Sequence, residues 1–242
     1  MSAMKPKRIL KPVFLMVMLV VPVSAIASEI TPAGRQLTTF LDSMHVDQLW
    51  LPGRQVDWRT GEPNGKVYSN ATSHTHCSAF AAATAEKAGI YLLHPPEHSA
   101  VLLANAQQDW LCGAGTNEGW QRVKSPIEAQ QLANQGWLVV VTCKNPDPKR
   151  PGHIAIVRPS TKSDDLILAQ GPDIIQAGAQ NSNSTTTQEG FKRHPGAFEN
   201  GQLLYFSHAL SLTTPKLEAA PESTRNNTGN VPPSARIKDS PK

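Results

Sequence analysis

The sequence predicts an α+β domain in which helices come first and an antiparallel sheet follows. Capping signals and helical spacing of apolar residues occupy the first half of the chain. Short apolar runs separated by Pro, Gly and Asp clusters occupy the second half, as is typical of strands. No repeat or second compositional block interrupts residues 28–212. We therefore expect one domain over 28–212, long enough to bury a single core.

Four segments carry helix signals. The first follows Thr31-Pro32, a cap residue with Pro at the first helical position, and has an apolar stripe. The second begins at Cys77 and ends at Lys87, before Gly89 as a left-handed stop, and its small residues predict burial against a sheet. The expected helices span 32–44, 77–87, 99–110 and 126–135. The expected strands then span 137–143, 153–158, 166–170, 174–177 and 203–207.

The N-terminus has the layout of a secretory signal peptide. A positive segment without acidic residues precedes the apolar run Val13–Val23 and the small residues Ser24, Ala25 and Ala27. The apolar run is shorter than the roughly 20 residues that a spanning helix needs. We expect residues 1–27 to be removed on export to the periplasm or medium, with no permanent membrane span, although an uncleaved anchor is the alternative.

The charge balance does not indicate nucleic-acid binding. The signal peptide holds four basic residues and no acidic one, so the formal net charge of +4 falls to about zero when it is removed. Nucleic-acid binding would require a clustered positive face on the domain itself. Residues 213–242 are rich in Pro, Ser, Thr, Asn and charges, which predicts a disordered tail that cannot bury a core.

The chain has three cysteines. In an oxidising compartment, we expect one of them to be a reactive free thiol and the other two to form a disulfide. The division that we expect pairs Cys112 with Cys143 and leaves Cys77 free. Three buried, unpaired thiols are the alternative interpretation.

The segment Thr75-His76-Cys77-Ser78-Ala79-Phe80 and the segment Pro151-Gly152-His153-Ile154 predict a nucleophile and its base. Unpaired N–H groups and the positive end of the dipole favour the thiolate of a cysteine in the first turn of a helix. A histidine that opens a strand can take its proton. A buried core thiol is the alternative for Cys77.

The order of a helix-borne Cys, a His at a strand start and a polar residue on a later strand resembles the papain-like superfamily of NlpC-like peptidases and CHAP amidases. The resemblance covers roughly residues 68–206 and includes the segments THCSAF, GWLVVV, PGHIAIVRP and GPDIIQAG. It implies a peptidoglycan hydrolase without a cofactor. His76 stands before Cys77, where this superfamily commonly has Asp, Asn or Gln.

A third polar group is expected to orient the imidazole of His153. Gln176 is the preferred residue, because Ile174 and Gly178 share its strand face and would leave its amide directed inward. Gln170 and Asn181 are rivals at a similar distance along the chain.

The backbone N–H of Cys77 is expected to hold the oxyanion, with help from Tyr68, Asn70 or His76. His74 and His76 also allow a zinc interpretation, but a further ligand at recognisable spacing is missing, so no metal is predicted. The aromatic rings of Trp110, Trp120 and Trp137 are interpreted as core or groove walls. His194 and His208 are interpreted as surface residues.

These features predict an exported cysteine amidase or endopeptidase that acts on peptidoglycan stem peptides through Cys77, His153 and Gln176. Peptidoglycan is the expected partner, and a protein activator or inhibitor is possible. Two alternatives stay open: a non-catalytic wall-binding or scaffold protein on the same fold, and a wall-targeting amidase toxin with an immunity partner.

Overall fold

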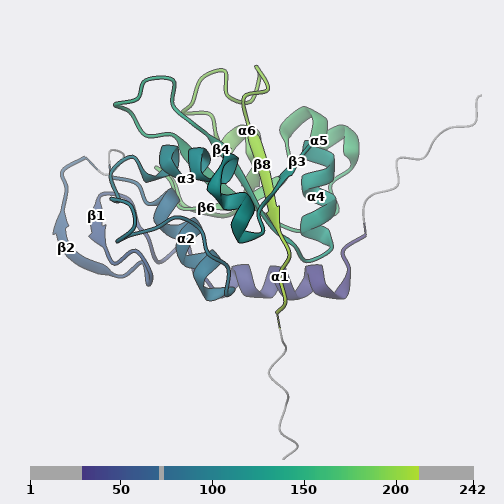
Figure 1. Cartoon of the computed structure of the whole chain (residues 1–242), viewed down its shortest axis with the longest axis horizontal. Coiled ribbons are helices and arrows are strands. Elements are labelled where there is room, and N and C mark those ends of the chain that lie inside the picture. Colours follow the sequence, from purple (N-terminus) through teal and green to yellow (C-terminus); the bar gives the residue numbers. More distant parts are fainter. Residues whose placement is uncertain (1–28, 71–73, 213–242) are drawn as a thin grey trace, which may run out of the picture. The chain divides into compact units, whose positions relative to one another are not determined.

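The computed structural model describes residues 29–70 and 74–212 (Figure 1). The predicted signal peptide, 1–27, and the predicted tail, 213–242, lie outside these described residues. Helices and an antiparallel sheet are mixed in the described part, which confirms the α+β class. No helix in the described ranges combines the length and the apolar character needed to cross a membrane.

A six-stranded sheet, antiparallel between all neighbours, forms the centre of the fold. Every residue of its two middle strands is buried, so both faces of the sheet are covered here. A separate two-stranded ribbon joins β1 (Arg54–Val56) to β2 (Pro63–Val67). In spatial order the strands of the large sheet are β3 (Gln121–Val123), β8 (Leu204–His208), β4 (Leu138–Cys143), β5 (His153–Val157), β6 (Asp173–Gln176) and β7 (Ser182–Thr186).

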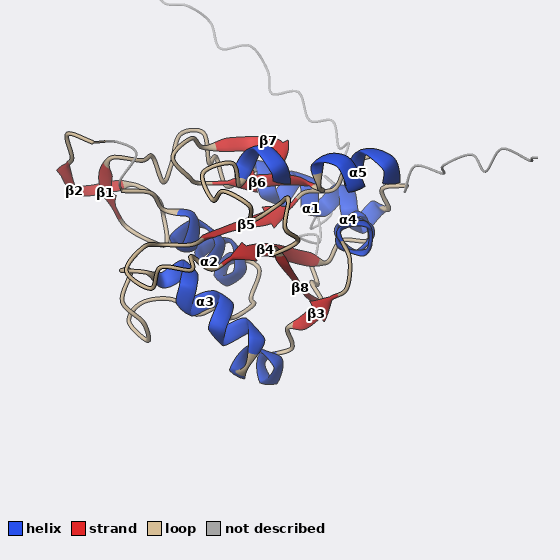
Figure 2. Cartoon of the chain, turned by 90° about the horizontal axis from the view of Figure 1, so that it is seen from above, coloured by secondary structure: helices blue, strands red, loops and turns tan. Residues whose placement is uncertain are grey.

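The helices pack on both faces of this sheet. Helix α2 lies against β5 and β6, α3 lies against β4 and β5 (Figure 2), and α4 lies against β3, β4, β5 and β8. Helix α1 packs against α4. The bounds are α1 (Pro32–Asp42), α2 (Cys77–Lys87), α3 (Leu103–Cys112), α4 (Pro126–Asn134), α5 (Asp164–Gln170) and α6 (Thr187–Gly190), with a 3₁₀ helix at Ala114–Glu118.

Two apolar cores follow from the alternation of side chains along the strands. Ile154 and Ile156 of β5 face the core that contains α2 and α3, whereas Ala155 and Val157 face the core that contains α4. Trp120 is fully buried in the first core, and Trp110 and Trp137 are half-buried at the margins of the first and second cores.

Helix α2 has the predicted bounds. Its alanine-rich surface is buried on nearly all sides, which lets the helix approach the sheet closely. The hydroxyl of Thr84 donates to the carbonyl of Phe80 at 2.8 Å and so satisfies a polar group inside the core. Gly89 follows the helix with φ +73°, the left-handed stop that the sequence predicts.

The predicted strand 166–170 is wrong, because this segment is helix α5. The hydroxyl of Ser163 accepts from the N–H of Leu166, and two acidic residues occupy the first turn. Both features favour a helix over the strand that the apolar run suggests. Only Ile167 is buried, while Leu166 and Leu168 are 48% and 61% exposed.

The predicted disulfide between Cys112 and Cys143 is also wrong. All three cysteines are free thiols: Cys112 is exposed, and Cys77 and Cys143 are buried. Cys112 ends α3, which packs on the face of the sheet shared with α2. The side chain of Cys143 belongs to the opposite core, so the sheet separates the two sulfurs.

Candidate active site

Cys77 is the first residue of α2, where the helix leaves backbone N–H groups unpaired. The preceding cap residue, His76, makes no side-chain capping bond. Burial raises the pKa of the Cys77 thiol above its ordinary value, since the side chain is only 5% exposed. The backbone groups of Ile154, Ser78 and Cys77 favour the thiolate and oppose this rise only in part.

His153 opens β5, as the sequence predicts. Helix α2, which begins at Cys77, packs against this strand, and the backbone of Ile154, the next residue of the strand, opposes the rise in the pKa of the Cys77 thiol that burial causes. Cys77 and His153 therefore both lie near the start of β5, although they are far apart in the sequence; the thiol belongs to the first core, and the imidazole contacts Phe191 of the second core. The imidazole packs edge-on against Phe191, with ring centroids 4.7 Å apart, and stacks on His194 at 5.7 Å.

Gln176 orients this imidazole. Its side-chain oxygen lies 2.7 Å from Nε2 of His153, and its amide nitrogen donates to the carbonyl of Gln180 at 3.3 Å. Because the oxygen can only accept, Nε2 of the neutral ring must carry the proton. The unprotonated nitrogen is then Nδ1, which is free to act as a base.

The two rival orienters are placed elsewhere. Gln170 is the last residue of α5. The amide nitrogen of Asn181 donates to the carbonyls of Val46, Leu49 and Trp50. Its oxygen accepts from the N–H of Gly178, so Asn181 serves to join distant loops.

Burial keeps the candidate nucleophile and base uncharged at neutral pH. It lowers the pKa of His153 to about 4, and the hydrogen bond to Gln176 opposes this only in part. The pKa of the Cys77 thiol is raised by the same cause. The resting arrangement is therefore a thiol and a neutral imidazole rather than an ion pair.

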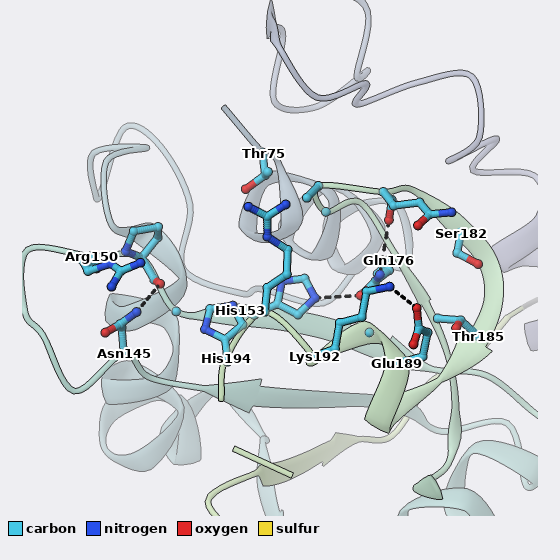
Figure 3. A pocket seen from close by; sticks show the side chains of 17 residues that line it. Thr75, Asn145, Arg150, His153, Gln176, Ser182, Thr185, Glu189, Lys192 and His194 are labelled. Carbon is cyan, nitrogen blue, oxygen red and sulfur yellow. Dashed lines mark hydrogen bonds and ion pairs between the residues drawn. The ribbon is translucent and has the colours of Figure 1, made fainter. Parts of the chain in front are cut away.

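A pocket of about 640 Å³ opens beside His153 and Gln176 (Figure 3). Thr75, two residues before the thiol, also lines it, whereas Cys77 is not among the lining residues. In Figure 3, Asn145 and Arg150 stand at one end of the pocket, Thr185 and Glu189 stand at the other, and the imidazole lies between them.

The interpretation of His194 as a plain surface residue is wrong. It is half-buried, lines the pocket and stacks on His153. His208, also assigned to the surface, is half-buried and its Nε2 lies 2.9 Å from the carbonyl of Glu118. The pocket cations were not predicted, although the run Lys192-Arg193-His194 directly after Phe191 was a usable signal.

The residues before α2 are engaged in local contacts. The ring of His74 stacks on Tyr68, with centroids 3.5 Å apart, and Nε2 of His76 lies 2.8 Å from the carbonyl of Arg54. In the part of the chain that the structure describes, no three His, Cys, Asp or Glu residues are grouped so as to hold a metal ion. Of the predicted oxyanion donors, the N–H of Cys77 is at the helix start, as required.

Comparison with known proteins assigns this chain to no family. No protein-family model matches the sequence, and no curated protein matches it significantly.

Proposed function

We propose that this protein is an exported cysteine hydrolase that cleaves amide bonds in peptidoglycan stem peptides, on a papain-like domain of the NlpC or CHAP type. The observation that carries the proposal is the 2.7 Å bond between His153 and Gln176 at a pocket, with Cys77 near the start of β5, which His153 opens. Cysteine hydrolases use a nucleophile, a base and a group that orients the base. Cys77, His153 and Gln176 are the candidates for these three roles.

In the first step, Nδ1 of His153 takes the proton of the Cys77 thiol as the sulfur attacks the carbonyl carbon of the amide. An S–C bond forms, and the N–H groups at the start of α2 stabilise the negative oxygen. Gln176 holds the imidazole and accepts from its Nε2–H, a hydrogen bond that favours the imidazolium without adding a negative charge.

In the second step, the imidazolium returns the proton to the leaving nitrogen, and the C–N bond breaks. A thioester on Cys77 and a free amine result. Water, deprotonated by His153, then attacks the thioester, releases the carboxylic acid and restores the thiol. The overall reaction consumes one water for each amide bond and needs no cofactor.

The substrate assignment rests on the resemblance of residues 68–206 to wall hydrolases and on the signal-like N-terminus. Export places the protein where peptidoglycan is accessible.

The test is digestion of purified cell-wall sacculi by the protein lacking residues 1–27, with the released fragments compared by mass. We expect new fragments with the wild type and none with Cys77→Ser or His153→Ala, a loss of about 10³-fold or more. Gln170→Ala is the control, because Gln170 was a candidate orienter that lies outside the pocket. Unchanged products from either catalytic variant would remove the assignment.

A second candidate is a wall-binding protein that kept the fold without the chemistry. The 5% exposure of Cys77 and its raised pKa favour this candidate, since both lower the reactivity of a thiol. It predicts that sacculi bind the wild type and Cys77→Ala equally and release no fragments with either. Co-sedimentation with sacculi, followed by mass analysis of the supernatant, distinguishes the two candidates.

A further inference from the structure

The pocket beside His153 is electropositive. Arg150, Lys192 and Arg193 line it, and Glu189 is the one acidic residue among its described lining. Lys192 forms an ion pair with Glu189, so these two charges compensate each other. Neither guanidinium has a carboxylate partner within the described residues, which leaves two uncompensated positive charges at the pocket.

The backbone holds Arg150 in place next to the candidate base. The carbonyl of Arg150 accepts from the side chain of Asn105 at 2.9 Å, and the carbonyl of Pro151 accepts from Asn145 at 3.1 Å. Only Pro151 and Gly152 separate Arg150 from His153. The position of this arginine along the pocket is therefore tied to that of the imidazole.

Arg193 belongs to a segment whose neighbouring side chains are packed against His153. It stands between Phe191 and His194, whose rings both contact the ring of His153. Phe191 is 1% exposed, so the segment that carries the arginine is fixed to the core. Burial lowers the pKa of His194 to about 4, and the charges of His153, Arg150 and Arg193 act in the same direction with smaller effects. Both arginines line the same pocket as His194 and His153.

We propose that Arg150 and Arg193 together bind a carboxylate of the substrate, so that the enzyme prefers wall peptides with a free carboxylate close to the scissile amide. The inference rests on the proposed function and adds the chemical class that the pocket selects. A guanidinium presents two parallel N–H donors that match the two oxygens of a carboxylate. Two such groups beside His153 would hold an acidic peptide with its neighbouring amide near the base.

The test measures binding of two soluble peptides from the cell wall to the Cys77→Ala protein by calorimetry. One peptide keeps its carboxylates, and the other carries them as carboxamides. We expect the acid form to bind roughly 10- to 100-fold more tightly, as for charge-assisted hydrogen bonds. Arg150→Gln and Arg193→Gln should each remove most of this preference. Lys149→Gln, which removes an exposed charge next to Arg150 outside the pocket lining, should leave it unchanged.

Three results would overturn the carboxylate site: equal affinity for both peptides, no binding of the acid form at millimolar concentration, or a preference that survives both arginine substitutions. Inorganic phosphate that binds as tightly as the acid peptide, and is lost in the same variants, would assign the pocket to a phosphate instead. Turnover by the wild type is measured in parallel. Selective binding without cleavage would reject the hydrolase activity but support the carboxylate site. Cleavage of both peptides at equal rates would support the hydrolase activity but reject the carboxylate site.

Discussion

The pairing of His153 with an amide rather than a carboxylate decides the protonation of the candidate site. Gln176 fixes the proton on Nε2 but adds no negative charge to stabilise the imidazolium. Burial therefore dominates and lowers the pKa of His153 to about 4. Because the base must be neutral, we expect the kcat/KM of amide hydrolysis to fall only as the pH drops toward this value.

Gln176→Glu should move this acid limb to higher pH. A carboxylate that accepts from Nε2–H stabilises the imidazolium and raises the pKa of His153, by about one unit or more. The measurement is kcat/KM against pH for the wild type and the variant. Gln170→Glu adds the same charge at the end of α5 and is expected to leave the profile unchanged. A Gln176→Glu profile that coincides with the wild type would show that His153 is not the base.

At the scale of elements, the start of β5 depends on a close backbone approach. A Cβ atom on Gly152 would lie 2.1 Å from the carbonyl oxygen of Cys143 and 2.6 Å from the side-chain oxygen of Asn105. Both neighbours must therefore move if any side chain is introduced. The position of His153, the next residue, follows from this contact.

Gly152→Ala is expected to lower the free energy of unfolding by about 2–3 kcal/mol, as overpacking does, and to reduce hydrolysis as well. Urea denaturation and activity measured on the same preparation test this. Gly65→Ala is the control, because its new Cβ would meet only the flexible side chain of Gln55. Native stability and full activity of Gly152→Ala would contradict the close approach.

Helix α5 gives a second test at this scale. Ile167→Ala removes a buried side chain and should cost about 2–4 kcal/mol of unfolding free energy. Leu168→Ala removes one that is 61% exposed and should cost less than about 0.5 kcal/mol. Equal costs at the two positions would contradict the packing of α5, in which Ile167 is buried and Leu168 is exposed.

The sequence predicted elements that carry their own local signals and missed those that depend on partners. The bounds of α2 follow from Cys77, Lys87 and Gly89, and the structure has them as predicted. Strand β7 is rich in Ser and Thr and forms only because it pairs with β6, so its sequence gave little sign of it. The prediction of a disulfide is wrong because the number of cysteines does not indicate on which face of a sheet each sulfur lies.

The candidate site was predictable to a similar extent. The motifs around Cys77 and His153 indicated two of its residues, and strand alternation favoured Gln176 over its rivals. The contribution of the segment 189–194 was not predictable, because α6 and the turn after it bring Phe191 and His194 onto the imidazole through tertiary packing.

At the scale of the whole molecule, the buried imidazoles link folding to pH. Burial lowers the pKa of both His153 and His194 from 6.5 to about 4. Between these values the unfolded chain binds more protons than the folded chain, so the free energy of unfolding falls as the pH falls. The contribution of these two imidazoles to the free energy of unfolding is fully present above about pH 6.5 and is lost as the pH falls toward 4.

Denaturation by urea at several pH values between 7 and 4.5 measures this slope. We expect His153→Gln and His194→Gln each to flatten it, since each removes one titrating group from the balance. The exposed His45, replaced by Asn, is the control and should keep the wild-type slope. A slope that is the same in all four proteins would show that these imidazoles do not stay neutral in the fold.

The most direct test of the central claim is capture of the thioester on Cys77. The protein is mixed with soluble wall peptide, quenched with acid during turnover and analysed by intact and peptide mass spectrometry. We predict an added mass equal to the acyl part of the cleaved peptide, located on Cys77, absent from the exposed Cys112 and removed by hydroxylamine. Cleavage products that accumulate from the purified protein while Cys77 carries no acyl group at any time would contradict the account.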